Sequence, residues 1–263
     1  RGERSSRKSG ARRVTAAVLR YGAPPVLSLA VGIAAWYAVS YLILTPERRF
    51  LLPPPHQVWE VSISDPTHLQ PMLDALMVTM RVAALGFVFA TLVGVAVGAL
   101  MAQARWVERA VYPYAVLLQV VPILAIVPLI GLWLGFSVTS RVVVCVMIAL
   151  FPIITNTHFG FRSVDRNLHE LFDLGRSSRP RRLVRLELPA ALPSILTGLK
   201  IASGQVVIGA IIGDMFFAQG DPGIGTLINT YRAQLRSEDL LAAIGLASAF
   251  GIVVFALFSA FST

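Results

Sequence analysis

Long uncharged stretches constrain this chain more than any other feature. Five runs of at least 20 residues contain no Asp, Glu, Lys or Arg, and they cover residues 21–46, 82–104, 110–140, 142–161 and 240–263. A sixth run, 190–217, is interrupted only by Lys200 and Asp214. About 20 apolar residues suffice for a helix to cross the hydrocarbon core of a bilayer. We therefore predict an all-α, polytopic membrane protein with six transmembrane helices.

Composition agrees with a chain that lies largely in lipid. Charged residues make up 14% of the sequence, whereas a soluble domain carries about 25%. The first 22 residues are basic and lack apolar periodicity, so we expect a cytoplasmic arm over 1–22 and a transmembrane domain over 23–263. The predicted spans are about 25–44, 72–103, 110–133, 140–160, 190–217 and 240–261.

The distribution of basic residues predicts the orientation. Sixteen of the 23 basic residues lie in segments 1–22, 103–110 and 160–189. The segments on the other side hold five: Arg48, Arg49, Arg141, Arg232 and Arg236. Because Lys and Arg concentrate in cytoplasmic loops, we place both termini inside and predict a multi-pass protein of the inner (plasma) membrane. The net charge of +9 then reflects topology, and we expect membrane lipid rather than nucleic acid as the charged partner.

Small residues and prolines predict how the spans pack. Span 72–103 carries a small residue at every fourth position, which lets another helix approach closely: Gly86, Ala90, Gly94, Gly98 and Ala102. Prolines at 113, 122, 128 and 152 predict that the spans 110–133 and 140–160 are bent or broken. Cys145, the only cysteine, lies mid-span and is expected to be a buried packing residue.

The loop 160–189 combines seven arginines with two short amphipathic patterns. Asp165 can cap a helix over 166–174, which would place Leu168, Leu171 and Phe172 on one apolar face. Gly175 would end that helix in left-handed geometry. Ser178 would cap a second helix, with Pro180 in its first turn and its end before Pro189. The apolar face has two interpretations: it docks on a partner, or it rests on its own helix ends or on the lipid surface.

The spacing of this loop resembles the cytoplasmic loop of ABC importer permeases. That signature is Glu-Ala-Ala, three residues, Gly, nine residues, Ile or Leu, any residue, then Leu-Pro. Here Glu170-Leu171-Phe172 is followed at the same spacing by Arg176 and by Leu186-Glu187-Leu188-Pro189. Leu171 and Phe172 replace the alanines, and Arg176 stands at the glycine position with Gly175 one residue earlier.

Further motifs are similar to the nitrate/sulfonate/taurine-type permease group, over about residues 51–260. They lie at 52–58 (LPPPHQV), 132–136 (LWLGF), 152–165 (PIITNT to GFRSVD) and 189–200 (PAALP to TGLK). The resemblance implies the type I ABC importer permease fold. It also implies ATP-driven uptake of a small organic solute by alternating access, with no covalent chemistry in the permease itself.

The resemblance also implies partners and contact residues. Two cytoplasmic ABC ATPase subunits, a second permease subunit and an extracytoplasmic solute-binding protein would assemble with this chain. We expect the second permease to be identical to this chain, with a different permease subunit as the alternative. ATP and Mg²⁺ would bind in the ATPase, because the glycine-rich segment 220–225 has no Gly-Lys-Ser/Thr after it. No cofactor is expected in this chain. The residues expected to contact the ATPase are Leu168, Glu170, Leu171, Phe172, Gly175 and Arg176.

Four residues of span 190–217 could belong to a pathway or gate. Gln205, Gly209 and Gly213 form a polar-and-small stripe that either lines a path or packs tightly against another helix. Asp214 lies near the outer end of the span. It is either a gate or contact for the binding protein, or a helix-end residue in water.

Two other classes of protein remain as alternatives. A polytopic membrane enzyme would need clustered reactive side chains, but the intramembrane candidates Arg81, His158 and Asp214 are scattered. The four histidines show no metal-ligand spacing, so no metal site or catalytic residue is expected. An ion-coupled secondary transporter would need acidic residues at mid-membrane and an internal repeat, whereas Asp74 and Asp214 lie near outer ends.

Overall fold

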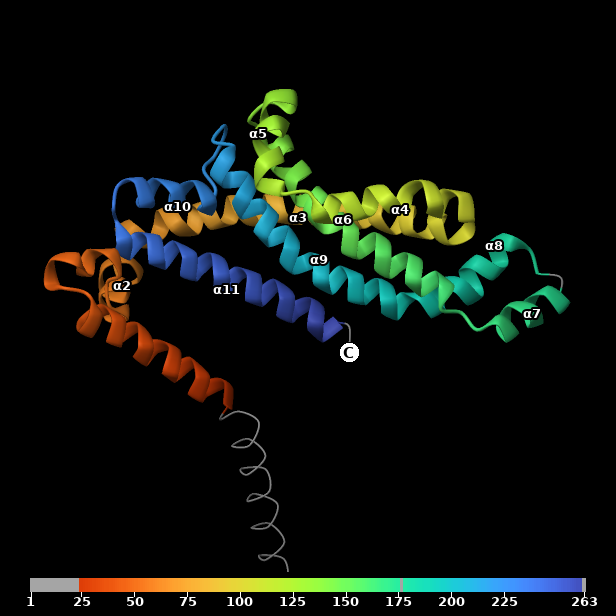
Figure 1. Ribbon diagram of the computed structural model, residues 1–263, viewed down its shortest axis with the longest axis horizontal. Helices are drawn as coiled ribbons and strands as arrows, with labels where there is room; N and C mark the ends of the chain where they lie inside the picture. The colour runs from red at the N-terminus through yellow and green to blue at the C-terminus, as the bar shows by residue number, and fades with distance from the viewer. Residues whose placement is uncertain (1–23, 176, 262–263) are drawn as a thin grey trace, which may run out of the picture.

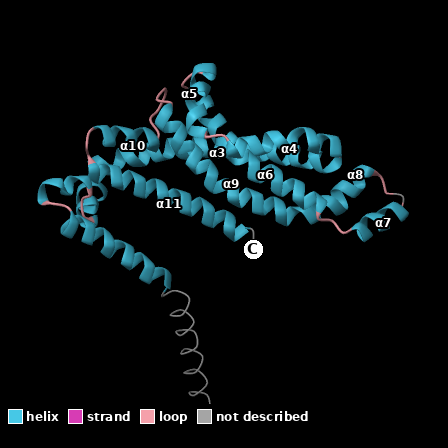
Figure 2. Cartoon of the chain, viewed as in Figure 1, coloured by secondary structure: helices cyan, strands magenta, loops and turns pink. Residues whose placement is uncertain are grey.

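The computed structural model describes residues 24–175 and 177–261, without the side chains at positions 166, 169 and 173. The predicted basic arm, 1–22, and Arg176 lie outside the described residues. Every regular element within the described ranges is helical (Figure 2). The prediction of an all-α fold is therefore confirmed.

The helices follow one another with short connections (Figure 1). In chain order they are a first helix (Pro24–Ile43) that ends in the π-turn η1 (Val39–Ile43), η2 (Pro46–Leu51), α2 (Pro55–Val58), η3 (Trp59–Ile63), α3 (Pro66–Gln103), α4 (Arg105–Val120), α5 (Ile123–Leu134), α6 (Val138–Arg162), α7 (Arg166–Leu174), α8 (Arg179–Arg182), η4 (Leu183–Glu187), α9 (Leu188–Phe216), α10 (Ile224–Ala233) and α11 (Ser237–Phe261).

Five helices are long and apolar enough to cross a membrane: Pro24–Ile43, Pro66–Gln103, Val138–Arg162, Arg179–Phe216 and Ser237–Ala260. The pair α4–α5 makes a sixth if it is counted as one span. At 38 residues α3 is roughly 57 Å long, so it extends beyond a hydrocarbon core of about 30 Å. Hydrogen bonds from the Thr67 hydroxyl and amide to the Asp65 side chain cap its N-terminus and lower the pKa of that carboxyl.

The span predicted at 110–133 is broken. Helices α4 and α5 meet at an angle of 105°, and the break falls at Val121–Pro122. Pro122 has no N–H to donate and disfavours helical geometry in the residue before it, so the chain turns there. Figure 1 shows α5 projecting from the bundle as a result. By contrast, α6 runs unbroken through Pro152, where we had expected a bend or break.

Helix α6 lies at the centre of the bundle, between α3 and α9. A Cβ atom on Gly94 would lie 2.7 Å from Ile153 Cγ2, and one on Gly98 would lie 2.7 Å from the Ile154 carbonyl oxygen. The small-residue stripe of α3 therefore allows close contact with α6, as predicted. Cys145 is fully buried in this layer and acts as a packing residue, also as predicted.

Helix α8 continues into the membrane span, which corrects the prediction that it ends before Pro189. Residues 179–216 form one continuous helix, with π geometry over Leu183–Glu187. A proline ring inside an α-helix clashes with the carbonyl four residues earlier, which for Pro189 is that of Arg185. The wider π-turn, closed by the Leu188 amide donating to the Leu183 carbonyl, changes that spacing and lets the helix continue.

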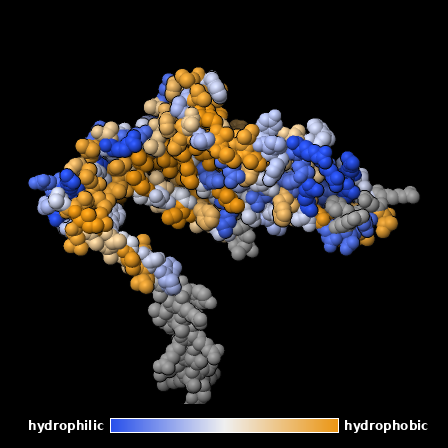
Figure 3. All heavy atoms as spheres, in the orientation of Figure 1, coloured by the Kyte–Doolittle hydropathy of each residue, from blue (hydrophilic) through white to orange (hydrophobic). Residues whose placement is uncertain are grey.

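Hydrophilic residues gather at two ends of the molecule, with hydrophobic residues between them (Figure 3). One end, which we call the loop end, carries α7 and α8 beyond the ends of α6 and α9 (Figure 1). The opposite end carries α2 and α10. This distribution fits a molecule whose middle lies in lipid and whose two ends meet water.

Candidate functional site

Helix α7 forms a separate surface at the loop end. Its N-terminus is capped as predicted: the Asn167 amide donates to the Asp165 side chain at 2.9 Å, and the Leu168 amide donates to the Asp165 carbonyl. The helix ends after Leu174, and α8 begins at Arg179. Its nine residues therefore stand as one helix between two longer ones (Figure 1).

The apolar residues of α7 lie mostly in the open. Leu168 is 43% exposed, Leu171 61% and Leu174 83%. Phe172 is half-buried, while Glu170 and Gly175 are exposed. The leucines at positions i, i+3 and i+6 follow one side of the helix and make an apolar ridge, which we call the α7 ridge. Such a ridge on a charged surface is typical of a protein contact.

The turn after α7 differs from the prediction. Gly175 does not adopt left-handed geometry, and a Cβ atom there would have its nearest neighbours at 3.6 Å, which is ordinary contact. The helix is closed by two hydrogen bonds: the Gly175 amide donates to the Leu171 carbonyl, and the Ser177 amide donates to the Phe172 carbonyl.

A buried ion pair joins the other ends of α6 and α9. Arg141 and Asp214 are 0% and 1% exposed, and Arg141 Nη1 lies 3.2 Å from Asp214 Oδ1. The Thr79 hydroxyl of α3 donates to Asp214 Oδ2 at 2.5 Å. Asp214 is therefore not a helix-end residue in water, which was one of the two interpretations predicted for it. Each charge is buried because the other neutralises it inside the bundle.

The same pair fastens the connection between α9 and α10. The Arg141 guanidinium donates to the carbonyls of Phe217, Gln219 and Asp221 at 3.0–3.1 Å. The Ile224 amide donates to the Thr79 hydroxyl at 2.8 Å. Gly223 lies so close to the Asp214 carboxylate that any side chain there would overlap it. The connection is therefore held to three helices at once.

The remaining predicted pathway residues of α9 face different neighbours. A Cβ atom on Gly209 would lie 2.9 Å from Cys145 Cα, and one on Gly213 would lie 3.1 Å from Arg141 Cα, so both glycines face α6. Gln205 is half-buried and lines an open, mostly apolar groove between α9 and α11. The four residues thus do not meet on one surface.

Sequence reasoning missed two residues of the buried cluster, Arg141 and Thr79. A signal for the first was present, because Arg141 and Asp214 are opposite charges that each flank or interrupt an apolar run. Charges in such positions usually pair with one another. Thr79 gave no signal, because a threonine within an apolar helix is common and its partner depends on the packing.

The broken span, the continuous core helices and the exposed α7 ridge define a multi-pass α-helical membrane protein with an exposed apolar surface at one end. The chain belongs to the family described as "Binding-protein-dependent transport system inner membrane component", which matches residues 77–263. It is therefore an inner-membrane ABC importer permease. The ATPase of such a system is a separate component, so this subunit is not itself the enzyme.

Relatives in curated collections include transport permeases for small solutes. The chain is 33% identical over 232 residues to the formylaminopyrimidine transport permease protein ThiX of Halalkalibacterium halodurans, covering 88% of this chain and 90% of the relative. It is 30% identical over 182 residues to the putative aliphatic sulfonates transport permease protein SsuC of Bacillus subtilis, covering 69% and 62%.

The fold also matches a solved transporter. A crystal structure of an amino acid ABC transporter with histidines superposes with a TM-score of 0.61 at 14% identity, covering 76% of this chain and 96% of the other. The chain thus has the type I ABC importer permease fold that its loop spacing implied.

Proposed function

We propose that this permease forms part of a solute pathway that alternates between inward-facing and outward-facing states. A separate ATPase docked on the loop 160–189 drives the change, with ATP and Mg²⁺ bound in the ATPase. The α7 ridge carries this proposal. A short helix that stands apart from the bundle and exposes three leucines gains most by burying them in a partner's groove.

The charge around the ridge supports a protein contact at the cytoplasmic face. The described loop carries exposed arginines at positions 162, 179, 181 and 185. Cytoplasmic segments of membrane proteins are enriched in such residues, so the loop end faces the cytoplasm in this proposal and both termini lie on that side. The opposite end then meets the extracytoplasmic binding protein.

The assembly that follows has two permease subunits and two ATPase subunits. We propose that the second permease is a copy of this chain, since twofold-symmetric dimers are the commonest homo-oligomers among soluble proteins. Membrane lipid surrounds the pair. The residues proposed to contact the ATPase are Leu168, Glu170, Leu171, Phe172, Gly175 and Arg176.

The transported solute is proposed to be a small organic molecule. The printed names of the two relatives, a formylaminopyrimidine permease and an aliphatic sulfonates permease, support this class. Among the four predicted pathway residues, Gln205 is the one whose side chain lines an open groove, so we propose that it faces the pathway. Asp214 would act indirectly, by holding the α9–α10 connection in place.

The test is a double variant of α7, Leu171→Ala/Phe172→Ala, in the transporter expressed with its ATPase. We expect the ATPase to be lost from the purified complex, because truncating a large side chain that is a hot spot of a contact costs about 2 kcal/mol or more. The permease should still purify as a folded membrane protein. Subunit ratios on a sizing column and solute-stimulated ATP hydrolysis measure the two effects.

A matched control is the double variant Phe50→Ala/Leu51→Ala, which changes two adjacent residues at the opposite end of the molecule. These residues have the same types and are also exposed, at 46% and 54%. The control should retain the ATPase. If the Leu171→Ala/Phe172→Ala variant keeps the ATPase and its solute-stimulated ATP hydrolysis, the assignment of α7 as the docking site is refuted.

A further inference from the structure

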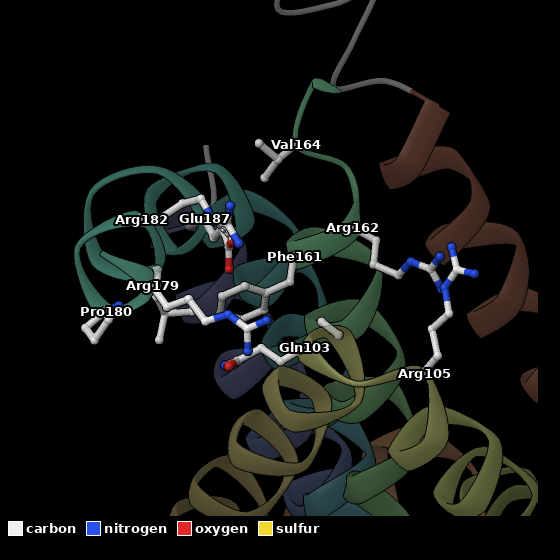
Figure 4. A pocket seen from close by; sticks show the side chains of 11 residues that line it. Gln103, Arg105, Phe161, Arg162, Val164, Arg179, Pro180, Arg182 and Glu187 are labelled. Atoms are coloured by element: carbon white, nitrogen blue, oxygen red, sulfur yellow. Dashed lines mark ion pairs between the residues drawn. The ribbon is translucent and has the colours of Figure 1, made fainter. Parts of the chain in front are cut away.

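Arginines line a pocket at the loop end, beside α7 but not part of the α7 ridge. The cavity has a volume of about 670 Å³ and lies among the end of α3, the start of α4, the end of α6 and the segment α8–η4. Four arginines line it (Arg105, Arg162, Arg179 and Arg182), together with a single carboxylate, Glu187. Figure 4 shows Arg105 and Arg162 on one side, and Arg179, Arg182 and Glu187 on the other. We call this cavity the arginine pocket.

The arginine pocket has a net positive charge even when the ion pairs of its arginines are counted. Arg162 is neutralised from outside the pocket by Glu108, at 2.9 and 3.0 Å, and Arg182 lies 3.3 Å from the Glu187 carboxylate. Arg105 and Arg179 are exposed and make no ion pair within the described residues. Two guanidinium groups are therefore available to an anion. A guanidinium donates two parallel hydrogen bonds, which match the oxygens of a phosphate group.

The inner wall of the pocket is apolar. Phe161 and Leu183 line it together with Ala102, and Phe161 is almost fully buried. A free inorganic anion would gain nothing from these side chains. A phospholipid would place its phosphate among the arginines and its glycerol or upper acyl chain against the apolar wall.

The pocket also lies where three candidate membrane spans begin or end. Its walls include the ends of the candidate membrane spans Pro66–Gln103 and Val138–Arg162 and the start of Arg179–Phe216. Trp106, next to Arg105, is 75% exposed, and exposed tryptophans concentrate at the membrane–water interface. Basic pockets between helix ends on the cytoplasmic side favour anionic headgroups.

We propose that the arginine pocket binds the phosphodiester headgroup of an anionic phospholipid, with Arg105 and Arg179 donating to the phosphate. The bound lipid bridges the start of α4 and the start of α8, and so ties the loop 160–189 to the membrane end of the bundle. This inference goes beyond the transport function, because it requires neither the ATPase nor a solute.

The test measures lipid binding to the purified full chain in detergent by native mass spectrometry. The probes are dioleoyl phosphatidylglycerol, dioleoyl phosphatidylcholine and inorganic phosphate. Phosphatidylglycerol should bind more tightly than the other two. The variant Arg105→Gln/Arg179→Gln should weaken phosphatidylglycerol binding by about tenfold or more, since each interfacial arginine contributes on the order of fivefold.

A matched control removes the same charge from the same surface. Arg181 and Arg185 are exposed arginines of the α8–η4 segment that do not line the pocket. Arg181→Gln/Arg185→Gln should change phosphatidylglycerol binding by no more than about twofold. A second pocket variant, Gln103→Glu, places a carboxylate on the wall without removing an arginine and should also weaken binding.

Three results would overturn the proposal. They are an equal loss in the pocket and control variants, equal binding of the two lipids, and binding of inorganic phosphate as tight as that of phosphatidylglycerol.

Discussion

At the scale of single residues, the Arg141–Asp214 pair is the most consequential contact in the bundle. Both side chains are fully buried, and the guanidinium also satisfies three carbonyls of the α9–α10 connection. A buried pair adds little stability over an apolar pair, because desolvation of both charges offsets their attraction. Loss of one partner is different, since it leaves the other charge buried without compensation. The pair therefore fixes geometry more than it adds stability.

We predict that single and double variants of this pair will be far from additive. Arg141→Met and Asp214→Leu should each lower the free energy of unfolding by about 3 kcal/mol or more, because each leaves one uncompensated charge. The loss of unfolding free energy in the double variant should be smaller than the sum of the two single losses, by at least about 1 kcal/mol. Thermal unfolding of the purified protein in detergent measures the three values. Additive losses would show that the two charges do not depend on each other.

At the scale of elements, close contact between α9 and α6 depends on glycine. The Gly209 Cα lies against the backbone of Cys145, with no room for a methyl group. Gly204, five residues earlier on the same helix, has open space where its Cβ would be. The two positions thus differ in their surroundings but share one helix, one backbone conformation and one residue type.

Replacement by alanine should affect the stability of the protein differently at the two glycines. Gly209→Ala must push α6 and α9 apart, and overpacking of this kind typically costs about 1–3 kcal/mol. Gly204→Ala should be neutral or stabilising by up to about 1 kcal/mol, because alanine reduces the freedom of the unfolded chain. The midpoints of thermal unfolding give the comparison. If the unfolding midpoints of both variants shift in the same direction, the contact between α6 and α9 does not require glycine at position 209.

The elements differ in how far their sequences predict them. Long apolar runs predict the spans, and Pro122 marks the break between α4 and α5, because both signals are local. The π-turn over Leu183–Glu187 and the unbroken course of α6 through Pro152 are not predictable in this way. Whether a proline ends a helix depends on the helices that pack around it, and sequence periodicity does not contain that information.

In the candidate site, too, features set by local sequence were predicted and features set by helix packing were not. Spacing alone located the loop 160–189 and its apolar residues, because a contact surface on one short helix is a local pattern. The buried cluster of Thr79, Arg141 and Asp214 joins three helices, and any two of its residues are at least 62 positions apart in the sequence. Which side chains meet there depends on how the helices pack, so only the presence of two unpaired charges in apolar segments could be read from the sequence.

At the scale of the whole molecule, polar residues lie at two ends separated by an apolar middle (Figure 3). One end carries the α7 ridge and the arginine pocket, and the other carries α2, α10 and the fastened α9–α10 connection. This separation is what an importer needs, because the solute is delivered on one side and ATP is used on the other. The orientation that we propose places the loop end in the cytoplasm.

Cysteine labelling in intact cells tests this orientation. Cys145 is the only native cysteine and is fully buried, so an introduced cysteine can be labelled selectively. Glu60→Cys, at an exposed position of the opposite end, should react with a membrane-impermeant maleimide added outside. Ser178→Cys, exposed at the loop end, should react only after the membrane is permeabilised. The reverse pattern would invert the topology and exclude a cytoplasmic partner for α7.

The central claim, that α7 contacts the ATPase, is tested most directly by site-specific photo-crosslinking in the assembled transporter. A photoreactive amino acid at Leu174, the most exposed leucine of the α7 ridge, should crosslink to the ATPase in high yield. The same amino acid at Leu51, exposed at the opposite end, should give no crosslink to it. Absence of a crosslink from position 174, or an equal crosslink from position 51, would contradict the account.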